Sequence, residues 1–111
     1  MINSSKAANN VLVLELTVDS LDASNVRKLK EAVADLIGAS NRVVLDLSGL
    51  KFVDSSGLGV MLSCLRNVRE RNGDLRLCSM TPTVRSLFEL MRMHRVFNIY
   101  ETKDEAVNAF D

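Results

Sequence analysis

The sequence predicts an α/β fold, with a largely parallel sheet of four to five strands and about four helices packed mainly on one face. Short apolar stretches typical of strands alternate along the 111 residues with stretches whose apolar residues recur every three or four positions. A recurrence every three or four positions places the apolar residues on one face of a helix. Strands that alternate with helices form sheets in which most neighbours are parallel and joined by right-handed crossovers.

The helices are expected mainly on one face because the strands are not apolar on both sides. In the predicted strand Val11–Val18, Leu14 and Leu16 share one face, whereas Glu15 and Thr17 share the other. A sheet covered on both faces would have more continuous apolar strands. The second face should therefore be partly exposed.

The remaining elements follow in order from the same patterns. The polar residues 1–10 are expected to be loose or to form a weak edge strand, and no linker divides residues 1–111, which should form one domain. The predicted elements are strand Val11–Val18, a helix capped by Asp22 or Ser24 and ending near Ile37, strand Val43–Leu47, a helix from about Ser56 to Arg71, strand Asp74–Ser79, a helix starting at Thr81-Pro82, strand Phe97–Tyr100 and helix Asp104–Phe110.

Residues that begin or end helices, together with stripes of apolar residues, support the three predicted longer helices. Gly38 is a stop for the first helix, Asn72-Gly73 ends the second, and Pro82 suits the first turn of the third. The stripes expected to face the core are Val26, Leu29, Val33, Leu36 and Ile37, then Leu58, Met61, Leu62, Leu65 and Val68, then Val84, Leu87, Phe88 and Met91.

Composition excludes several classes of function. Fourteen basic residues balance fourteen acidic ones, which argues against a nucleic-acid partner. Seven arginines against three acids between Arg66 and Arg95 indicate a solvated face. The apolar runs are too short to span a bilayer and the N-terminus has no secretory signal, so we expect a cytoplasmic protein without a membrane partner.

The cysteines and the histidine do not suggest a metal or disulfide site. Cys64 falls in a helical pattern and Cys78 in a strand, and two cysteines do not make a disulfide framework. With His94 as the single histidine and no Cys-x-x-Cys spacing, a structural zinc site is not expected. We expect no cofactor and no metal.

The segment from Phe52 to Leu62 organises the rest of the chain. It connects the strand Val43–Leu47 to the second helix, so Asp54, Ser55 and Ser56 stand where that helix begins. There, small side chains with oxygen atoms can accept hydrogen bonds from backbone N–H groups that have no helical partner, and added negative charge is favoured. A serine in this place can be a cap, a nucleophile or a phosphoacceptor.

Two catalytic or ligand-binding interpretations fit the segment poorly. A hydrolase would use Ser56 as nucleophile, but Asp54 stands where Gly-x-Ser-x-Gly has its first glycine, and His94 is the one candidate base. A phosphate-binding loop would need a lysine after Gly57 and Gly59, and none follows. Both glycines have a simpler explanation, which is close approach of the backbone at a crowded turn.

The segment resembles the signature of bacterial anti-sigma factor antagonists, the single-domain members of the STAS family. The residues that carry the resemblance are Asp54-Ser55-Ser56-Gly57-Leu58-Gly59 after Val43-Val44-Leu45-Asp46-Leu47-Ser48, with Ser20-Leu21-Asp22, Gly73 and Pro82-x-Val84-x-x-Leu87-Phe88 elsewhere. The likeness extends from Val11 to Phe110. It implies a STAS-like fold.

The resemblance also implies partner switching. In that family the unphosphorylated protein binds a serine kinase that is also an anti-sigma factor, and binding releases the sigma factor. The kinase phosphorylates a serine of the motif, usually the second one, which here is Ser56, and a metal-dependent serine phosphatase reverses the modification. The chain itself would need no catalytic residue, because the kinase and the phosphatase supply the chemistry. We expect it to be a monomer.

The resemblance assigns a partner-binding surface as well. It comprises Asp22, Asp54, Ser55, Ser56, Gly57 and Leu58. Asp22 matches a family aspartate that lies near the acceptor. One departure is the pair Asp19-Ser20, where the family often has Gly-Glu, and it leaves the choice of kinase open. A STAS interaction subunit outside sigma-factor control, for example on a lipid-transport ATPase or in a larger signalling assembly, remains the alternative.

Overall fold

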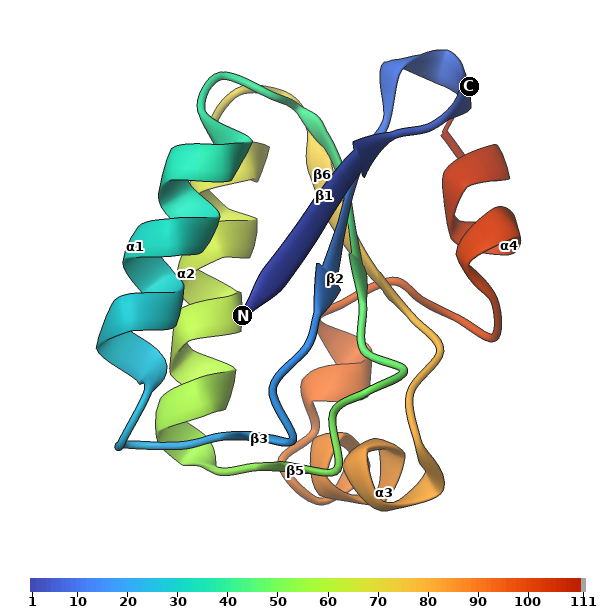
Figure 1. The fold of residues 1–111 in the computed structure, drawn as a ribbon. Helices are drawn as coiled ribbons and strands as arrows, with labels where there is room; N and C mark the ends of the chain where they lie inside the picture. The colour runs from blue at the N-terminus through green and yellow to red at the C-terminus, as the bar shows by residue number, and fades with distance from the viewer. Residues whose placement is uncertain (111) are drawn as a thin grey trace.

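The computed structural model describes residues 1–110, which form a mixed five-stranded sheet covered by helices (Figure 1). The strand order is β1 (Ile2–Lys6), β2 (Leu12–Leu16), β4 (Arg42–Asp46), β6 (Asp74–Cys78) and β7 (Ile99–Tyr100). Strand β1 lies antiparallel to β2 at the edge, and every other neighbouring pair in this sheet is parallel. The largely parallel sheet predicted from the sequence is confirmed.

The helices are distributed unevenly over the two faces. Helices α1 (Val26–Ile37) and α2 (Ser55–Arg69) lie side by side on one face, and α4 (Lys103–Asn108) lies on the other (Figure 1). Helix α3 (Pro82–Leu90) closes one end of the larger core, and the short 3₁₀ turns η1 (Ala8–Asn10) and η2 (Met93–Arg95) complete the chain. Packing mainly on one face is therefore confirmed.

Two hydrophobic clusters correspond to the two faces. The larger one joins the inward residues of β2, β4 and β6 to α1, α2 and α3, and Phe88 meets Phe97 edge to face with 5.9 Å between ring centroids. The smaller one, beneath α4, contains Val11, Val13, Val44, Cys78, Ala106, Val107 and Phe110. The alternation along β2 decides which side chains enter which cluster.

Two residues assigned to buried stripes are exposed. The side chain of Leu36 is 40% exposed because it lies at the edge of its stripe, in the last turn of α1. Met91 is 45% exposed because it follows the last helical residue of α3, where the chain turns through Arg92 at a φ of 59°. The apolar stripe predicted for this helix therefore extends one residue beyond the observed end of α3 at Leu90.

The sequence patterns missed a second, two-stranded sheet. Strand β3 (Ser20–Leu21) pairs in parallel with β5 (Phe52–Val53), with Ser20 opposite Phe52 and Leu21 opposite Val53. Each of these strands has two residues, which are too few to show a strand periodicity in the sequence. This pair, called here the β3–β5 ribbon, joins the start of α1 to the start of α2.

Candidate functional site

Asp54 is the N-cap of α2. It lies in extended backbone conformation, and its Oδ1 atom accepts hydrogen bonds from the hydroxyl of Ser56 at 2.6 Å and the backbone N–H of Gly57 at 3.0 Å. A short acidic side chain placed directly after β5 thereby satisfies a helix N–H group that has no partner within the helix. The cap predicted from the sequence is confirmed, with Asp54 rather than a serine as the capping residue.

These contacts also fix the charge of Asp54. The Ser56 hydroxyl and then the Gly57 N–H hold the pKa of its carboxyl below the ordinary value of 3.8, against a smaller opposing effect of burial. The backbone N–H groups of Ser56 and Ala23 lower the pKa further. Asp54 is therefore a carboxylate at neutral pH, and Ala23 connects it electrostatically to the turn that precedes α1.

That turn is built around Asp22. Its Oδ1 atom accepts hydrogen bonds from the backbone N–H and the hydroxyl of Ser24, and its Oδ2 atom accepts one from the Ser20 hydroxyl at 3.0 Å. The bonds from Ser24, followed by the bond from Ser20, hold the pKa of the Asp22 carboxyl below its ordinary value. The side chain of Asn25 closes the turn by accepting from Asp22 N and donating to Ser20 O.

Asp22 and Ser24 do not cap α1, contrary to our expectation. The N-cap is Asn25, because the backbone makes one more turn before the helix begins and the N–H groups of Asn25 and Val26 donate to Asp22 O. Ser20, Ser24 and Asn25 are contributors to the site that the sequence patterns missed. The spacing Ser-x-Asp-x-Ser, with a hydroxyl two residues to either side of a carboxylate, was the available signal.

The β3–β5 ribbon brings the two carboxylates to one end of the molecule. Leu21 lies opposite Val53, and the Asp54 N–H donates to Leu21 O at 3.1 Å. Leu21 and Val53 are buried, so the residues that follow them emerge together from the core. The Asp22 turn consequently lies beside the first turn of α2.

Gly57 is required by this close approach. A Cβ atom at position 57 would lie 2.7 Å from both Leu21 O and Val53 Cγ2, which is closer than real Cβ contacts. Gly59 differs, since a Cβ there would have no heavy atom within 4 Å. The crowded-turn explanation is confirmed for Gly57 and is wrong for Gly59.

The remaining residues of the motif differ in accessibility. Ser55 is exposed, whereas Asp22, Asp54 and Ser56 are half-buried. Gly57 is buried, and the Leu58 side chain is 4% exposed and belongs to the larger core. The serines and carboxylates are therefore accessible from outside the molecule, whereas the Leu58 side chain anchors the helix from beneath.

The surroundings of Ser56 are unlike those of a hydrolase nucleophile. Its hydroxyl donates to Asp54, a weak base with a lowered pKa, while His94 is an exposed residue of η2. Within residues 1–110, no three His, Cys, Asp or Glu side chains gather in a way that could hold a metal ion. None of the helices described there is both long and apolar enough to cross a membrane.

Comparison with known proteins assigns the family. The family model described as "STAS domain" matches residues 4–106. The chain belongs to the STAS domain family. Within this STAS family it groups with the anti-sigma factor antagonists: it is 31% identical to BtrV of Bordetella bronchiseptica, a protein assigned to that class, over 87% of this chain and 95% of BtrV.

Solved STAS structures agree with the fold. An anti-sigma-factor antagonist (STAS) domain protein from Planctomyces limnophilus superimposes with a TM-score of 0.88 at 26% identity, over 97% of this chain and 96% of that one. The anti-sigma factor antagonist SpoIIAA in its unphosphorylated form gives 0.80 at 24% identity over 98% and 95% of the chains. Phosphorylated SpoIIAA of Bacillus gives 0.70 at 23% identity over the whole of both chains. The STAS-like fold predicted from the motif is confirmed.

Proposed function

We propose that this protein is the phosphorylation-controlled component of a cytoplasmic partner-switching pathway. In its unmodified form it binds a serine kinase that is also an anti-sigma factor, and the bound sigma factor is released. Phosphorylation of Ser56 by the kinase ends the interaction, and a metal-dependent phosphatase restores it. The observation that carries the proposal is the position of Ser56 in the first turn of α2, bonded to Asp54 and beside the Asp22 turn.

The geometry suits Ser56 to accept a phosphoryl group. Because its proton is directed at Asp54 Oδ1, the remaining lone pairs of Oγ are available to an incoming phosphorus atom. The lowered pKa of Asp54 makes it a weak base, so the kinase would supply the group that removes the proton. Ser55 is exposed and precedes Ser56 by one helical position, which turns its side chain to a different direction.

The charge added by phosphorylation explains the change in affinity. A phosphoserine carries about −1.5 to −2 charges at neutral pH and cannot donate the bond that Ser56 now makes to Asp54. The helix N-terminus favours a negative group, which makes the modification compatible with the fold. A partner surface shaped for a neutral hydroxyl beside two carboxylates would meet extra bulk and an anion that is costly to desolvate.

The proposal is tested by phosphorylation and displacement assays. The native chain, Ser56→Ala and Ser55→Ala would each be incubated with candidate kinases of the histidine-kinase-like fold, in complex with their sigma factors, and with Mg²⁺ and ATP. We expect one phosphate on the native chain and on Ser55→Ala, none on Ser56→Ala, and release of sigma factor by all three before modification. Phosphate mapped to Ser55, or full labelling of Ser56→Ala, would disprove the assignment of the acceptor. Binding to a transport ATPase instead would favour the role of a STAS interaction subunit.

A further inference from the structure

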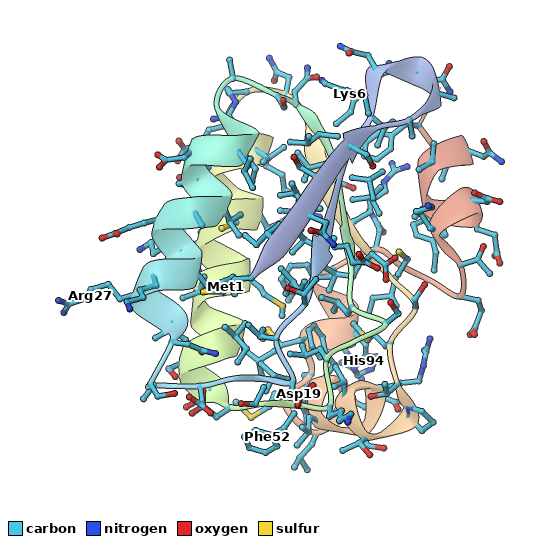
Figure 2. The ribbon with its side chains drawn as sticks, in the orientation of Figure 1. Met1, Lys6, Asp19, Arg27, Phe52 and His94 are labelled. Atoms are coloured by element: carbon cyan, nitrogen blue, oxygen red, sulfur yellow. The ribbon has the colours of Figure 1, made fainter. Side chains whose placement is uncertain are left out.

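Phe52 is an exposed aromatic residue in the β3–β5 ribbon. Its side chain is 45% exposed, although the neighbouring Val53 is 1% exposed. Successive strand residues point to opposite faces, so Val53 enters the core and Phe52 faces outward. Figure 2 shows the Phe52 ring outside the ribbon at the end of the molecule where Asp19 also lies. A single exposed apolar residue is ordinary in soluble proteins, so the position of Phe52 must carry the argument.

The register of the ribbon places Phe52 among the residues of the candidate site. It lies opposite Ser20, whose hydroxyl is bonded to the Asp22 carboxylate. Asp54 follows Phe52 by two residues, and Asp22 follows Ser20 by two. The outward side of the ribbon thus presents an aromatic ring and a hydroxyl, and the two carboxylates follow directly at the start of α2 and in the turn before α1.

The backbone beneath Phe52 is held in place. The N–H groups of Lys51 and Phe52 both donate to Asp19 O, at 2.7 and 3.3 Å, and the Asp54 N–H donates to Leu21 O. A ring that is carried on a fixed backbone loses little conformational freedom when a partner covers it. Aromatic residues, phenylalanine among them, are enriched at the buried centre of protein interfaces.

We infer that Phe52 is the apolar anchor of the partner-binding surface, and that the kinase covers it with an apolar pocket bordered by an arginine or lysine that bonds the Asp22 carboxylate. This inference rests on the proposed function and identifies the part of the surface that supplies affinity. The charge of the partner follows from the two carboxylates, whose hydrogen bonds keep them ionised. Phe52 supplies affinity when Ser56 is unmodified, and a phosphate on Ser56 prevents the pocket from closing over the ring.

The test compares Phe52 with an apolar residue of similar exposure elsewhere in the chain. Leu36 is 40% exposed and lies ten residues beyond the start of α1, about 15 Å along the helix from the ribbon. Kinase affinity would be measured for the native chain, Phe52→Ala, Phe52→Leu and Leu36→Ala. We expect Phe52→Ala to bind about thirtyfold or more weakly, Phe52→Leu to recover much of the loss, and Leu36→Ala to bind like the native chain. The melting temperatures should be similar, since Phe52 is not part of the buried core.

The outcomes separate this inference from the proposed function. If Phe52→Ala binds like the native chain, and phosphorylation of Ser56 still abolishes binding, the anchor is elsewhere and the partner-switching role stands. If Phe52→Ala and Leu36→Ala weaken binding equally, the effect is non-specific and the inference is wrong. If the native chain neither binds the kinase nor is phosphorylated by it, the proposed function fails and the anchor fails with it.

Discussion

The Ser56 hydroxyl and the Asp54 carboxylate are joined by a 2.6 Å hydrogen bond. The same Asp54 oxygen accepts the N–H of Gly57, so the residue that begins α2 also orients the candidate phosphoacceptor. The hydrogen bonds of Asp54 Oδ1 therefore cap α2 and orient the Ser56 hydroxyl at the same time. A modification of Ser56 must change the environment of Asp54, and a change at Asp54 must alter the orientation of Ser56.

Acid should weaken the fold through Asp54. Its carboxyl pKa is held below 3.8 in the folded chain and returns to the ordinary value on unfolding. Its stabilising effect is therefore complete above 3.8 and is lost as the pH falls through the lower, folded-state pKa. Melting temperatures recorded from neutral to acid pH should decline less steeply for Asp54→Asn than for the native chain. Asp35→Asn, an exposed change in α1, is the control, and parallel curves for native and Asp54→Asn proteins would contradict the expectation.

Gly57 and Gly59 should respond oppositely to alanine. Gly57→Ala places a methyl group against Leu21 O and Val53 Cγ2, so we expect the free energy of unfolding to fall by about 1–3 kcal/mol. Gly59→Ala adds a methyl group in open space within the same helix and should raise it by about 0.5–1 kcal/mol. Urea denaturation measures both. Equal destabilisation by the two substitutions would contradict the difference in available space around positions 57 and 59.

The charge of Asp22 should matter more for binding than for folding. In Asp22→Asn the side-chain oxygen can still accept the Ser24 N–H, so the turn should persist and the melting temperature should change little. The lost carboxylate should weaken kinase binding about tenfold or more. Calorimetric titration and thermal melting would be compared with Asp35→Asn, which removes a charge from an exposed part of α1. A large drop in melting temperature with unchanged affinity would assign Asp22 a structural role alone.

Phosphorylation should alter affinity without rearranging the sheet. Leu58, Met61 and Leu65 are buried and hold α2 in place, so a phosphate on Ser56 cannot easily move the helix. Affinity for the kinase should fall by about a hundredfold or more, mostly through faster dissociation. Ser56→Asp should reproduce part of the effect, whereas Ser56→Ala should bind constitutively. Amide spectra should change in the β3–β5 ribbon and the first turn of α2, and widespread changes across the five-stranded sheet would rule out a local mechanism.

The two thiols should be unreactive until the chain unfolds. Cys64 and Cys78 are buried, and burial raises the pKa of both, to about 11 for Cys78. Reaction with a thiol reagent near neutral pH should therefore be slow for the folded protein, because thiolate is the nucleophilic form. In denaturant both should react rapidly. Fast labelling of one thiol under native conditions, resolved by mass spectrometry, would instead indicate local opening of α2 for Cys64 or of β6 for Cys78.

The pattern of the sequence predicted most of the fold and the centre of the site. Alternating apolar residues placed Val11 and Val13 on the opposite face from Leu14 and Leu16, and those faces became the two cores. Asp54 and the two serines were expected at the start of a helix because an oxygen-bearing triplet followed a strand and preceded an apolar stripe. These features depend on residues close together in the chain, so local periodicity and capping chemistry suffice to find them.

Contacts between distant segments were decided by the tertiary structure alone. The pairing of Leu21 with Val53 spans more than thirty positions and involves strands too short to have a period, yet it brings the Asp22 turn beside α2 and turns Phe52 outward. The hydrogen bonds of Ser20 and Ser24 to Asp22 exist because the chain turns once more before α1. By itself the sequence determined which residues could form strands, helices and caps, since those preferences are local. The tertiary structure decided which of these elements meet, because burial of Leu21 and Val53 in a shared core selects one pairing among many that the local pattern permits.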